Sequence, residues 1–207
     1  MANTTFSGPV RSKGGFTSIS ENATTGAITT LSSISSTGVT SFDANTLATE
    51  AGTGITTGSG TIYRSSVQRV GGIITTRILI DLTGLRSTGS GDIIGVNGTS
   101  LVCHIGQITA AQNGTILTGS MECFEAPAGG DPDINVHSAT EGTGVEDGAI
   151  ADLTETLLVN AGDATLGSKV YFTAVPAADE FLYLTTGDAT DADYTAGKLF
   201  IEMMGYA

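Results

Sequence analysis

The sequence predicts an all-β protein, a jelly-roll-like antiparallel β-sandwich preceded by an extended N-terminal arm. First, threonine, serine and glycine supply 80 of the 207 residues. Threonine favours strands because its β-carbon is branched, whereas glycine and serine favour turns. Second, no segment sustains an apolar period of 3.6 residues in good helix formers. Third, short apolar stretches alternate with turn signals from Thr61 onward, which is typical of sandwiches, jelly rolls and barrels.

The clearest element is a hairpin over Thr61–Leu85, TIYRSSVQRVGGIITTRILIDLTGL. Gly71-Gly72 accepts the positive φ angles of a two-residue turn, so we expect Val70 to pair with Ile73. Successive side chains of a strand alternate between its two faces, so one face collects apolar residues and the other is polar. The expected pairs are Tyr63 with Ile80, Ser65 with Ile78 and Val67 with Thr76. The expected core face holds Tyr63, Val67, Ile74, Ile78, Ile80 and Leu82, and the polar face holds Arg64, Gln68, Arg77 and Asp81.

Two Asn-Gly pairs, at 97–98 and 113–114, are strong signals for further hairpins. The first is expected to separate IIGV from TSLVCHIGQI, and the second to separate Leu101–Ala110 from Thr115–Glu125. Leu153–Val159 is compatible with a strand or a short helix. The total is eight or nine strands from Thr61 onward, and eight suits a jelly roll. The remaining expected strands are Ile134–His137, Lys169–Val175, Glu180–Thr185 and Lys198–Met204.

Residues 1–60 are predicted to form an arm and a linker, and residues 61–207 the sandwich domain. The opening FSGPVRSKGGF contains Gly8-Pro9 and Gly14-Gly15 and has no periodicity, so we expect an extended arm that a partner orders. Ala27–Ile34 and Gly38–Phe42 could form short strands. AGTGITTGSG at 51–60 has glycine at four of ten positions and is predicted to be a flexible linker.

The net charge of −13 is unevenly distributed along the chain. Residues 1–120 carry 6 basic and 5 acidic side chains, whereas residues 121–207 carry 2 basic and 16 acidic ones. An acidic surface repels phosphates, so nucleic acid is not an expected partner. The acidic excess indicates either solubility or a basic partner. No stretch has the length and apolar character of a membrane span or a signal peptide, so no membrane association is expected.

Histidine and cysteine do not form a metal-binding pattern in this sequence. The histidines are His104 and His137, and His104 directly follows Cys103, which places those two side chains on opposite faces of a strand. Zinc requires three or four converging ligands. Cys103 and Cys123 are expected to be buried free thiols, with a disulfide as the alternative if their strands are neighbours.

Asp188, Asp191 and Asp193 in TGDATDADYTAG are the best candidates for calcium ligands, because calcium prefers several oxygens from one turn. The glycine of an EF-hand loop is missing, and the alternative is an acidic turn whose carboxylates bond its own backbone. The glycines of residues 52–58 and the Gly197-Lys198 pair lack the context of a phosphate-binding loop.

Catalytic patterns are also missing from the sequence. No Ser-His-Asp arrangement or nucleophile elbow is indicated. A glycosidase site would be expected to present aromatic platforms, and tryptophan is absent. We therefore expect a protein that is not an enzyme and holds no cofactor and no metal.

The basic residues are scarce, at eight in the whole chain. Arg64 and Arg77 share the polar face of the hairpin, with Arg86 nearby and Arg11 and Lys13 on the arm. This clustering indicates an ion-paired interface between subunits. Scattered solubilising charges are the alternative.

Three segments, MANTTFSGPVRSKGGF, VGGIITTRILIDLTGL and YTAGKLFIEMMGY, resemble parts of virion structural proteins from marine tailed bacteriophages. The resemblance covers most of the chain. It implies a coat-associated β-protein: a capsid decoration (cement) protein, or a head- or tail-fibre subunit. Decoration proteins of this group are often trimers that sit outside the shell and clamp capsid subunits. The resemblance supplies no catalytic motif.

The resemblance therefore implies a virion protein at the capsid exterior. A secreted-looking composition without a signal peptide fits assembly in the host cytoplasm, and the acidic half is expected to face away from the shell. The expected partners are the major capsid protein and further copies of the chain, in a homotrimer. The alternative is a fibre module that binds a host surface glycan, and a third hypothesis is a hydrolase of envelope polysaccharide acting through Asp188 or Asp193. The residues expected to contact the capsid are Phe6, Val10, Arg11, Lys13 and Phe16, and those expected at the subunit interface are Arg64 and Arg77.

Overall fold

The structure is a computed structural model that describes residues 16–21, 24, 26, 28–34, 40–42, 50–98 and 100–207. The chain divides into two compact units, Met1–Thr46 and Leu47–Ala207. In the first unit three antiparallel strands form one sheet in the order β1-β2-β3. These strands are β1 (Phe16–Glu21), β2 (Ile28–Ile34) and β3 (Thr40–Phe42). Strands β2 and β3 confirm the short strands predicted at Ala27–Ile34 and Gly38–Phe42, whereas β1 was not predicted.

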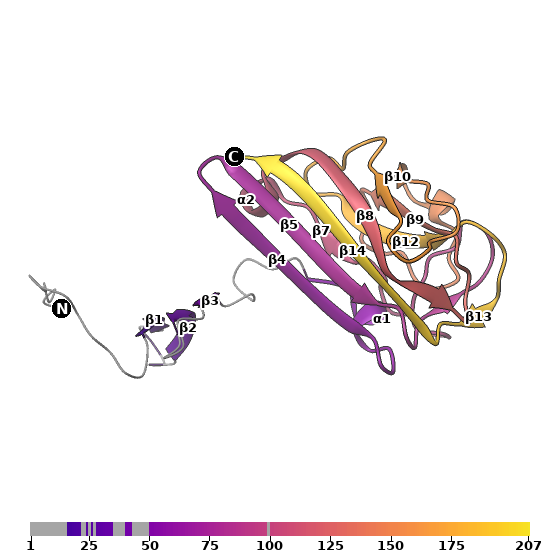
Figure 1. Ribbon diagram of the computed structural model, residues 1–207, viewed down its shortest axis with the longest axis horizontal. Helices are drawn as coiled ribbons and strands as arrows, with labels where there is room; N and C mark the ends of the chain where they lie inside the picture. Colours follow the sequence, from indigo (N-terminus) through magenta and orange to yellow (C-terminus); the bar gives the residue numbers. More distant parts are fainter. Residues whose placement is uncertain are drawn as a thin grey trace, which may run out of the picture. The chain divides into compact units, whose positions relative to one another are not determined.

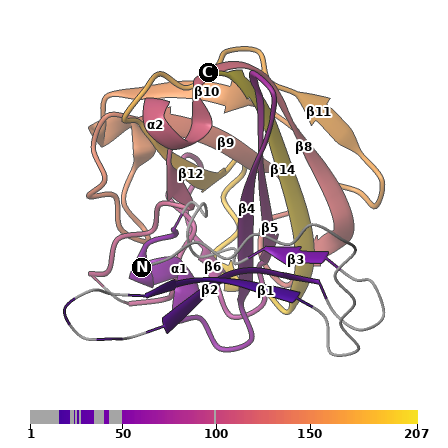
Figure 2. The same cartoon turned by 90° about the vertical axis from the view of Figure 1, so that its left-hand side faces the viewer.

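The second unit is a sandwich of antiparallel sheets, so the predicted all-β sandwich is confirmed, while the jelly-roll connectivity stays a prediction. The larger sheet has the strand order β11-β8-β14-β5-β4 and the smaller sheet the order β10-β9-β12-β7. Figure 1 shows the long strands of the larger sheet side by side, and Figure 2 shows the two layers from the side. The larger sheet contains β4 (Ile62–Val70), β5 (Ile73–Asp81), β8 (Thr115–Ala128), β11 (Lys169–Tyr171) and β14 (Ala196–Tyr206). The smaller contains β7 (Gly106–Gln107), β9 (Ile134–Ala139), β10 (Glu155–Val159) and β12 (Phe181–Thr186).

The predicted hairpin is confirmed as β4 and β5. Val70 pairs with Ile73, and the register continues from there as predicted. Gly71 has a φ of 62°, a left-handed conformation that glycine adopts without steric strain. The predicted core face is buried except for Tyr63, which is partly buried and packs against the core. Asp81 differs from the expectation of an open polar face, because it is mostly buried beneath Lys198 of β14, with Nζ and Oδ2 3.4 Å apart.

The C-terminal strand β14 is the central strand of the larger sheet. It pairs with β5 on one side and with β8 on the other over nearly its whole length. Leu199, Ile201 and Met203 alternate along it and are fully buried in the core. The hairpin and β8 are therefore joined through the last strand of the chain, and removal of β14 would divide the larger sheet in two.

Neither Asn-Gly pair forms its predicted hairpin. The segment around Asn97 makes isolated bridges, such as Arg86 with Gly95, instead of paired strands. Ala110–Asn113 forms the short helix α2, and Gly114 follows it with a φ of 67°. Asn113 is fully buried, and its side chain bonds residues of β5 and of the segment before α2. These tertiary hydrogen bonds outweigh the local turn preference of Asn-Gly.

Residues 51–60 belong to the sandwich unit and do not form the predicted flexible linker. Thr53–Thr56 is the helical turn α1, and Ile55 within it is fully buried in the core. The N–H of Gly54 donates to the carbonyl of Val102 at 2.8 Å. A β-carbon at Gly54 would lie 2.4 Å from Cys103 Sγ, so close packing explains this glycine.

The two central strands of the smaller sheet, β9 and β12, are buried on both sides, because loops of the chain cover their outer side. The hydroxyl of Tyr183 donates to the carbonyl of Glu141 at 2.7 Å and accepts from the N–H of Gly144 at 3.2 Å. Tyr183 is fully buried as a result, and Phe181 beside it packs on the ring of His104. The alternating inward and outward pattern of a half-exposed strand is therefore missing from β9 and β12.

Candidate functional site

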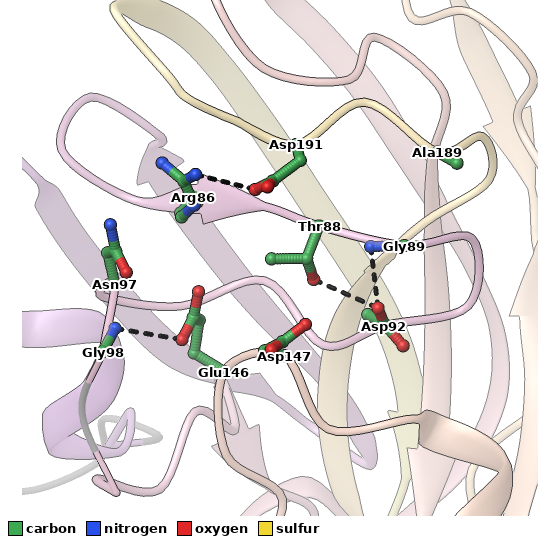
Figure 3. A pocket seen from close by; sticks show the side chains of 10 residues that line it. All are labelled: Arg86, Thr88, Gly89, Asp92, Asn97, Gly98, Glu146, Asp147, Ala189 and Asp191. Atoms are coloured by element: carbon green, nitrogen blue, oxygen red, sulfur yellow. Dashed lines mark hydrogen bonds and ion pairs between the residues drawn. The ribbon is translucent and has the colours of Figure 1, made fainter.

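Two features of the sandwich unit are candidates for function: a polar pocket beside β6 (Arg86–Ser87), and the outer face of the larger sheet. The pocket has a volume of about 600 Å³ and is formed by several loops (Figure 3). Its lining is polar and charged apart from small residues, which suits a hydrophilic ligand better than an apolar one. The lining residues are Arg86, Thr88, Gly89, Asp92, Asn97, Gly98, Glu146, Asp147, Ala189 and Asp191.

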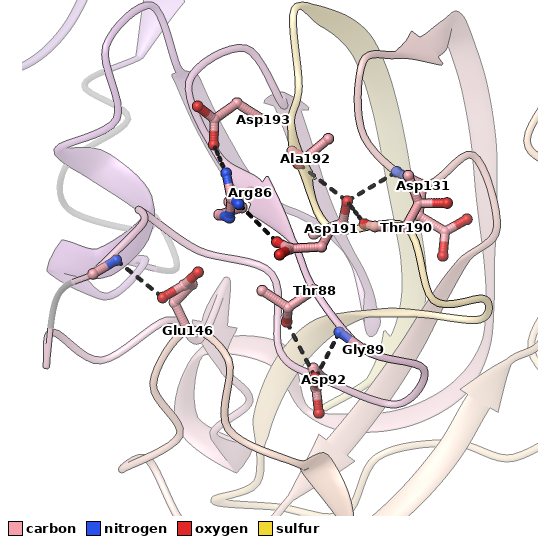
Figure 4. Close-up of polar contacts among 12 residues, drawn as sticks. Arg86, Thr88, Gly89, Asp92, Asp131, Glu146, Thr190, Asp191, Ala192 and Asp193 are labelled. Carbon is pink, nitrogen blue, oxygen red and sulfur yellow. Dashed lines mark hydrogen bonds and ion pairs between the residues drawn. The ribbon is translucent and has the colours of Figure 1, made fainter.

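Arg86 is the positive group of the pocket. The two terminal nitrogens of its guanidinium lie 2.8 Å from a carboxylate oxygen of Asp191 and 2.8 Å from one of Asp193 (Figure 4). Pairing of β6 with β13 (Ala192–Asp193) brings these groups together. Ser87 fixes the same corner, since its buried hydroxyl donates to the carbonyl of Thr190 at 2.6 Å.

Two of the three predicted calcium ligands therefore pair with Arg86, and the third is bonded through its backbone. Asp191 and Asp193 bind Arg86, and the backbone N–H of Asp188 donates to Asp131 Oδ2 at 2.9 Å. The alternative, in which these carboxylates bond their own backbone, is also incorrect for Asp191 and Asp193. Within the described ranges no group of three or more histidine, cysteine or acidic side chains is arranged to hold a metal ion.

Three further carboxylates line the pocket. Asp92 accepts hydrogen bonds from the Thr88 hydroxyl at 3.2 Å and from the Gly89 N–H at 2.7 Å. Glu146 is 8% exposed and accepts one from the Gly98 N–H at 3.1 Å. Burial raises the pKa of Glu146, and the charge of Asp147 acts in the same direction. Asp147 has a φ of 62°, a backbone conformation that asparagine and aspartate adopt more readily than most other residues.

The pocket thus offers several carboxylates, a guanidinium, an amide and a hydroxyl to a ligand. Such groups can bond hydroxyl or amino groups. Sequence reasoning had singled out Arg86 and Asp191 but missed Asp92 and Glu146. These residues come from separate loops, and no local spacing in the sequence connects them.

The predicted histidine and cysteine positions do not converge on this pocket. His137 pairs with Glu155, with Nδ1 2.7 Å from Oε2, and His104 packs on Phe181. Cys103 and Cys123 are free and buried, as expected, so the alternative of a disulfide is wrong.

The second candidate is the outer face of the larger sheet, the side directed away from the smaller sheet. It carries seven of the twelve large apolar side chains that are exposed in residues 50–207, among them Phe124, Met204 and Tyr206. Phe124 stacks on Phe200 with ring centroids 5.1 Å apart. The outer face is made by Ile62, Arg64, Ser66, Gln68 and Val70; Ile73, Thr75, Arg77, Leu79 and Asp81; Lys198, Phe200, Glu202, Met204 and Tyr206; Thr118, Ser120, Glu122, Phe124 and Glu125; and Lys169 and Tyr171.

Ion pairs cross the strands of the outer face. Arg77 Nε lies 2.7 Å from Glu202 Oε2, and Lys169 Nζ lies 3.5 Å from Glu122 Oε2. Lys198 pairs with Asp81 and with Glu125. The face holds four basic and four acidic side chains, so its net charge is zero. The rest of residues 50–207 holds 2 basic and 15 acidic side chains, a net charge of −13. Residues 1–49 hold equal numbers of basic and acidic side chains, so this is the net charge of the whole chain.

Arg64 and Arg77, the predicted interface residues, both lie on the outer face, on neighbouring strands. Arg77 is neutralised by Glu202 of its own chain. Arg64 makes no ion pair with any described residue, and its guanidinium donates to the carbonyl of Tyr63 at 2.8 Å. Of the predicted capsid contacts, Phe16 is the first residue of β1 and is 47% exposed. Phe6, Val10, Arg11 and Lys13 lie outside the described residues.

No helix among the residues that the structure describes is long and apolar enough to cross a membrane. Comparison of the chain with protein-family models, with curated proteins and with solved structures finds no match.

Proposed function

We propose that this chain is a structural virion protein, a capsid decoration (cement) protein that binds the outside of a phage shell and stabilises it as a homo-oligomer. The observation that carries the proposal is the outer face of the larger sheet, a broad apolar and charge-balanced surface on a sandwich. A protein that works by contact requires such a surface and requires no catalytic group. The resemblance of three segments to phage virion proteins supports the same role.

The shell-binding part of the proposal concerns the arm. Phe6, Val10, Arg11, Lys13 and Phe16 combine apolar and basic side chains, which suits contact with neighbouring capsid subunits. The strongly acidic surface outside the outer face would be directed away from the shell. No nucleic acid or membrane is involved in this role.

The decisive experiment measures the protein in purified virions. We expect a copy number comparable with that of the major capsid protein by quantitative mass spectrometry, and density over the shell by electron cryomicroscopy. A few copies at the tail, or none in the virion, would refute a decoration role.

A second experiment tests the arm on capsids that lack the protein. Deletion of residues 1–15 leaves β1 intact and is expected to abolish binding, and R11E/K13E to weaken it strongly. R69E is the matched control, because it reverses a charge of the sandwich unit. Unchanged binding by the deletion variant would remove the arm from the proposal.

The pocket favours a second candidate function, a fibre module that binds a host surface glycan. Carboxylates, the Arg86 guanidinium and the Asn97 amide can bond sugar hydroxyls, and the volume of about 600 Å³ is in the range of ligand sites. Binding to a glycan array that is lost in E146Q and kept in D152N, an exposed site outside the pocket, would support this candidate. Equal binding by both variants, or none by the wild type, would reject it.

A further inference from the structure

We propose that two copies of this chain meet through the outer faces of their larger sheets, related by a twofold axis. The inference rests on the homo-oligomer part of the proposed function and names the surface that makes it. It differs from the trimer that the resemblance implies, because one self-complementary face joins two copies and closes the assembly.

The size of the face is close to what a stable pair requires. The five strands of the larger sheet contain 46 residues. At about 3.4 Å per residue along a strand and about 4.8 Å between strands, the sheet covers about 750 Å². A specific interface buries about 800 Å² on each partner. The outer face therefore supplies nearly the whole area that a stable dimer needs.

The charge distribution selects this face over the rest of the surface. Each copy carries −13, and all of that excess lies off the outer face. Two copies that approached through the rest of the sandwich unit, with its 2 basic and 15 acidic side chains, would bring carboxylates together, which is unfavourable. On the outer face three of the four cations are already paired within the chain, for example Arg77 with Glu202, and the net charge of the face is zero, so the two surfaces can approach without net repulsion.

The chemistry of the face also fits a protein surface of the same kind. Phe124 and Phe200 form a stacked pair near Leu79 of β5, and Met204 and Tyr206 extend the apolar area towards the hairpin turn. Aromatic and methionine side chains are enriched in interface cores. The smaller sheet offers no comparable surface, because loops cover its outer side and Tyr183 beneath them is fully buried.

Light scattering coupled to size exclusion, together with sedimentation equilibrium, tests this inference on the purified full chain. We expect a mass of twice 20.9 kDa at micromolar concentration. R64E should raise the dissociation constant at least tenfold, because each substitution occurs twice in a twofold interface and makes both faces net negative. R69E is its matched control. Arg69 lies on the same strand, is exposed and makes no ion pair with a described residue, but its side chain lies on the face of β4 opposite to that of Arg64.

A second pair of variants tests the apolar contact. F124K should also shift the protein to monomer, whereas L166K, which changes a more exposed apolar side chain off the outer face, should not. Far-UV circular dichroism and the urea midpoint establish that each variant is folded. Because the ion pairs are internal, raising the salt concentration from about 0.1 to 1 M should change the dissociation constant less than threefold.

A monomer at 100 µM, a trimer, or a dimer that R64E and F124K leave intact would each overturn the inference. These results are independent of the virion measurements. A monomer in solution with many copies per shell would reject the twofold pair and keep the decoration role. A dimer that responds to R64E, in a protein missing from virions, would keep the twofold pair and reject the decoration role.

Discussion

Replacement of Asn113 by alanine tests whether a buried polar contact holds α2 (Ala110–Asn113) against the larger sheet. Asn113 is fully buried, and its side-chain amide donates to Thr76 Oγ1 at 2.8 Å and accepts from the Thr109 N–H at 2.9 Å. Each such hydrogen bond contributes about 1 kcal/mol net, and an unsatisfied buried partner costs a further 1 to 3 kcal/mol. N113A should therefore lower the free energy of unfolding by about 3 to 5 kcal/mol.

The measurement is urea unfolding followed by circular dichroism in the far ultraviolet, since the chain has no tryptophan. A double-mutant cycle with T76V isolates the Asn113–Thr76 bond, and we expect a coupling energy of about 1 to 2 kcal/mol. The chain contains its own control, because Asn97 also precedes a glycine but is exposed. N97A should change stability by less than about 0.5 kcal/mol. If N113A and N97A were equally stable, the assignment of a structural role to the buried amide would be refuted.

Two further predictions concern side chains whose pKa is raised by burial. Burial, and then the charges of Asp131 and Asp188, raise the pKa of Asp133, so the stability associated with its protonated form is lost as the pH rises through the folded pKa. D133N should raise the urea midpoint at pH 7 and have no such effect near pH 3, and an equal gain at both would contradict this. Burial raises the pKa of Cys103 to about 11 and also raises that of Cys123, so neither thiol should react with a disulfide reagent at about pH 8 until the chain is unfolded.

Every residue pair of the hairpin formed by β4 and β5 was predictable from the sequence, because the features that specify its register are local. The alternation of side chains and the Gly71-Gly72 turn specify its register without any other part of the chain. The position of the hairpin within the sheet was not predictable, since β5 is joined to β8 by β14, which is more than 100 residues away in sequence.

Asn113-Gly114 and residues 51–60 show why local signals fail elsewhere. Asn-Gly favours a tight turn, but at this position the amide has buried partners, and the glycine ends a helix. Four glycines in ten residues indicate flexibility, but Gly54 is required where the backbone approaches Cys103. The pocket was not predictable for a related reason: Asp92 and Glu146, which are far apart in sequence, line the same pocket only in the folded chain.

The distribution of charge in space leads to a different view of the interface from the one that the linear count suggests. Along the chain the cations lie mainly before residue 120 and the carboxylates after it, and the scarce cations Arg64 and Arg77 predict an ion-paired interface between subunits. In the sheet, however, β8 and β14 bring Glu122, Glu125 and Glu202 from the acidic half next to cations of the outer face. Those cations are satisfied within the chain, so attraction between opposite charges cannot be the main source of affinity there. Apolar area must supply it, and the ion pairs only leave the outer face without net charge, so that the excess of −13 lies outside the contact.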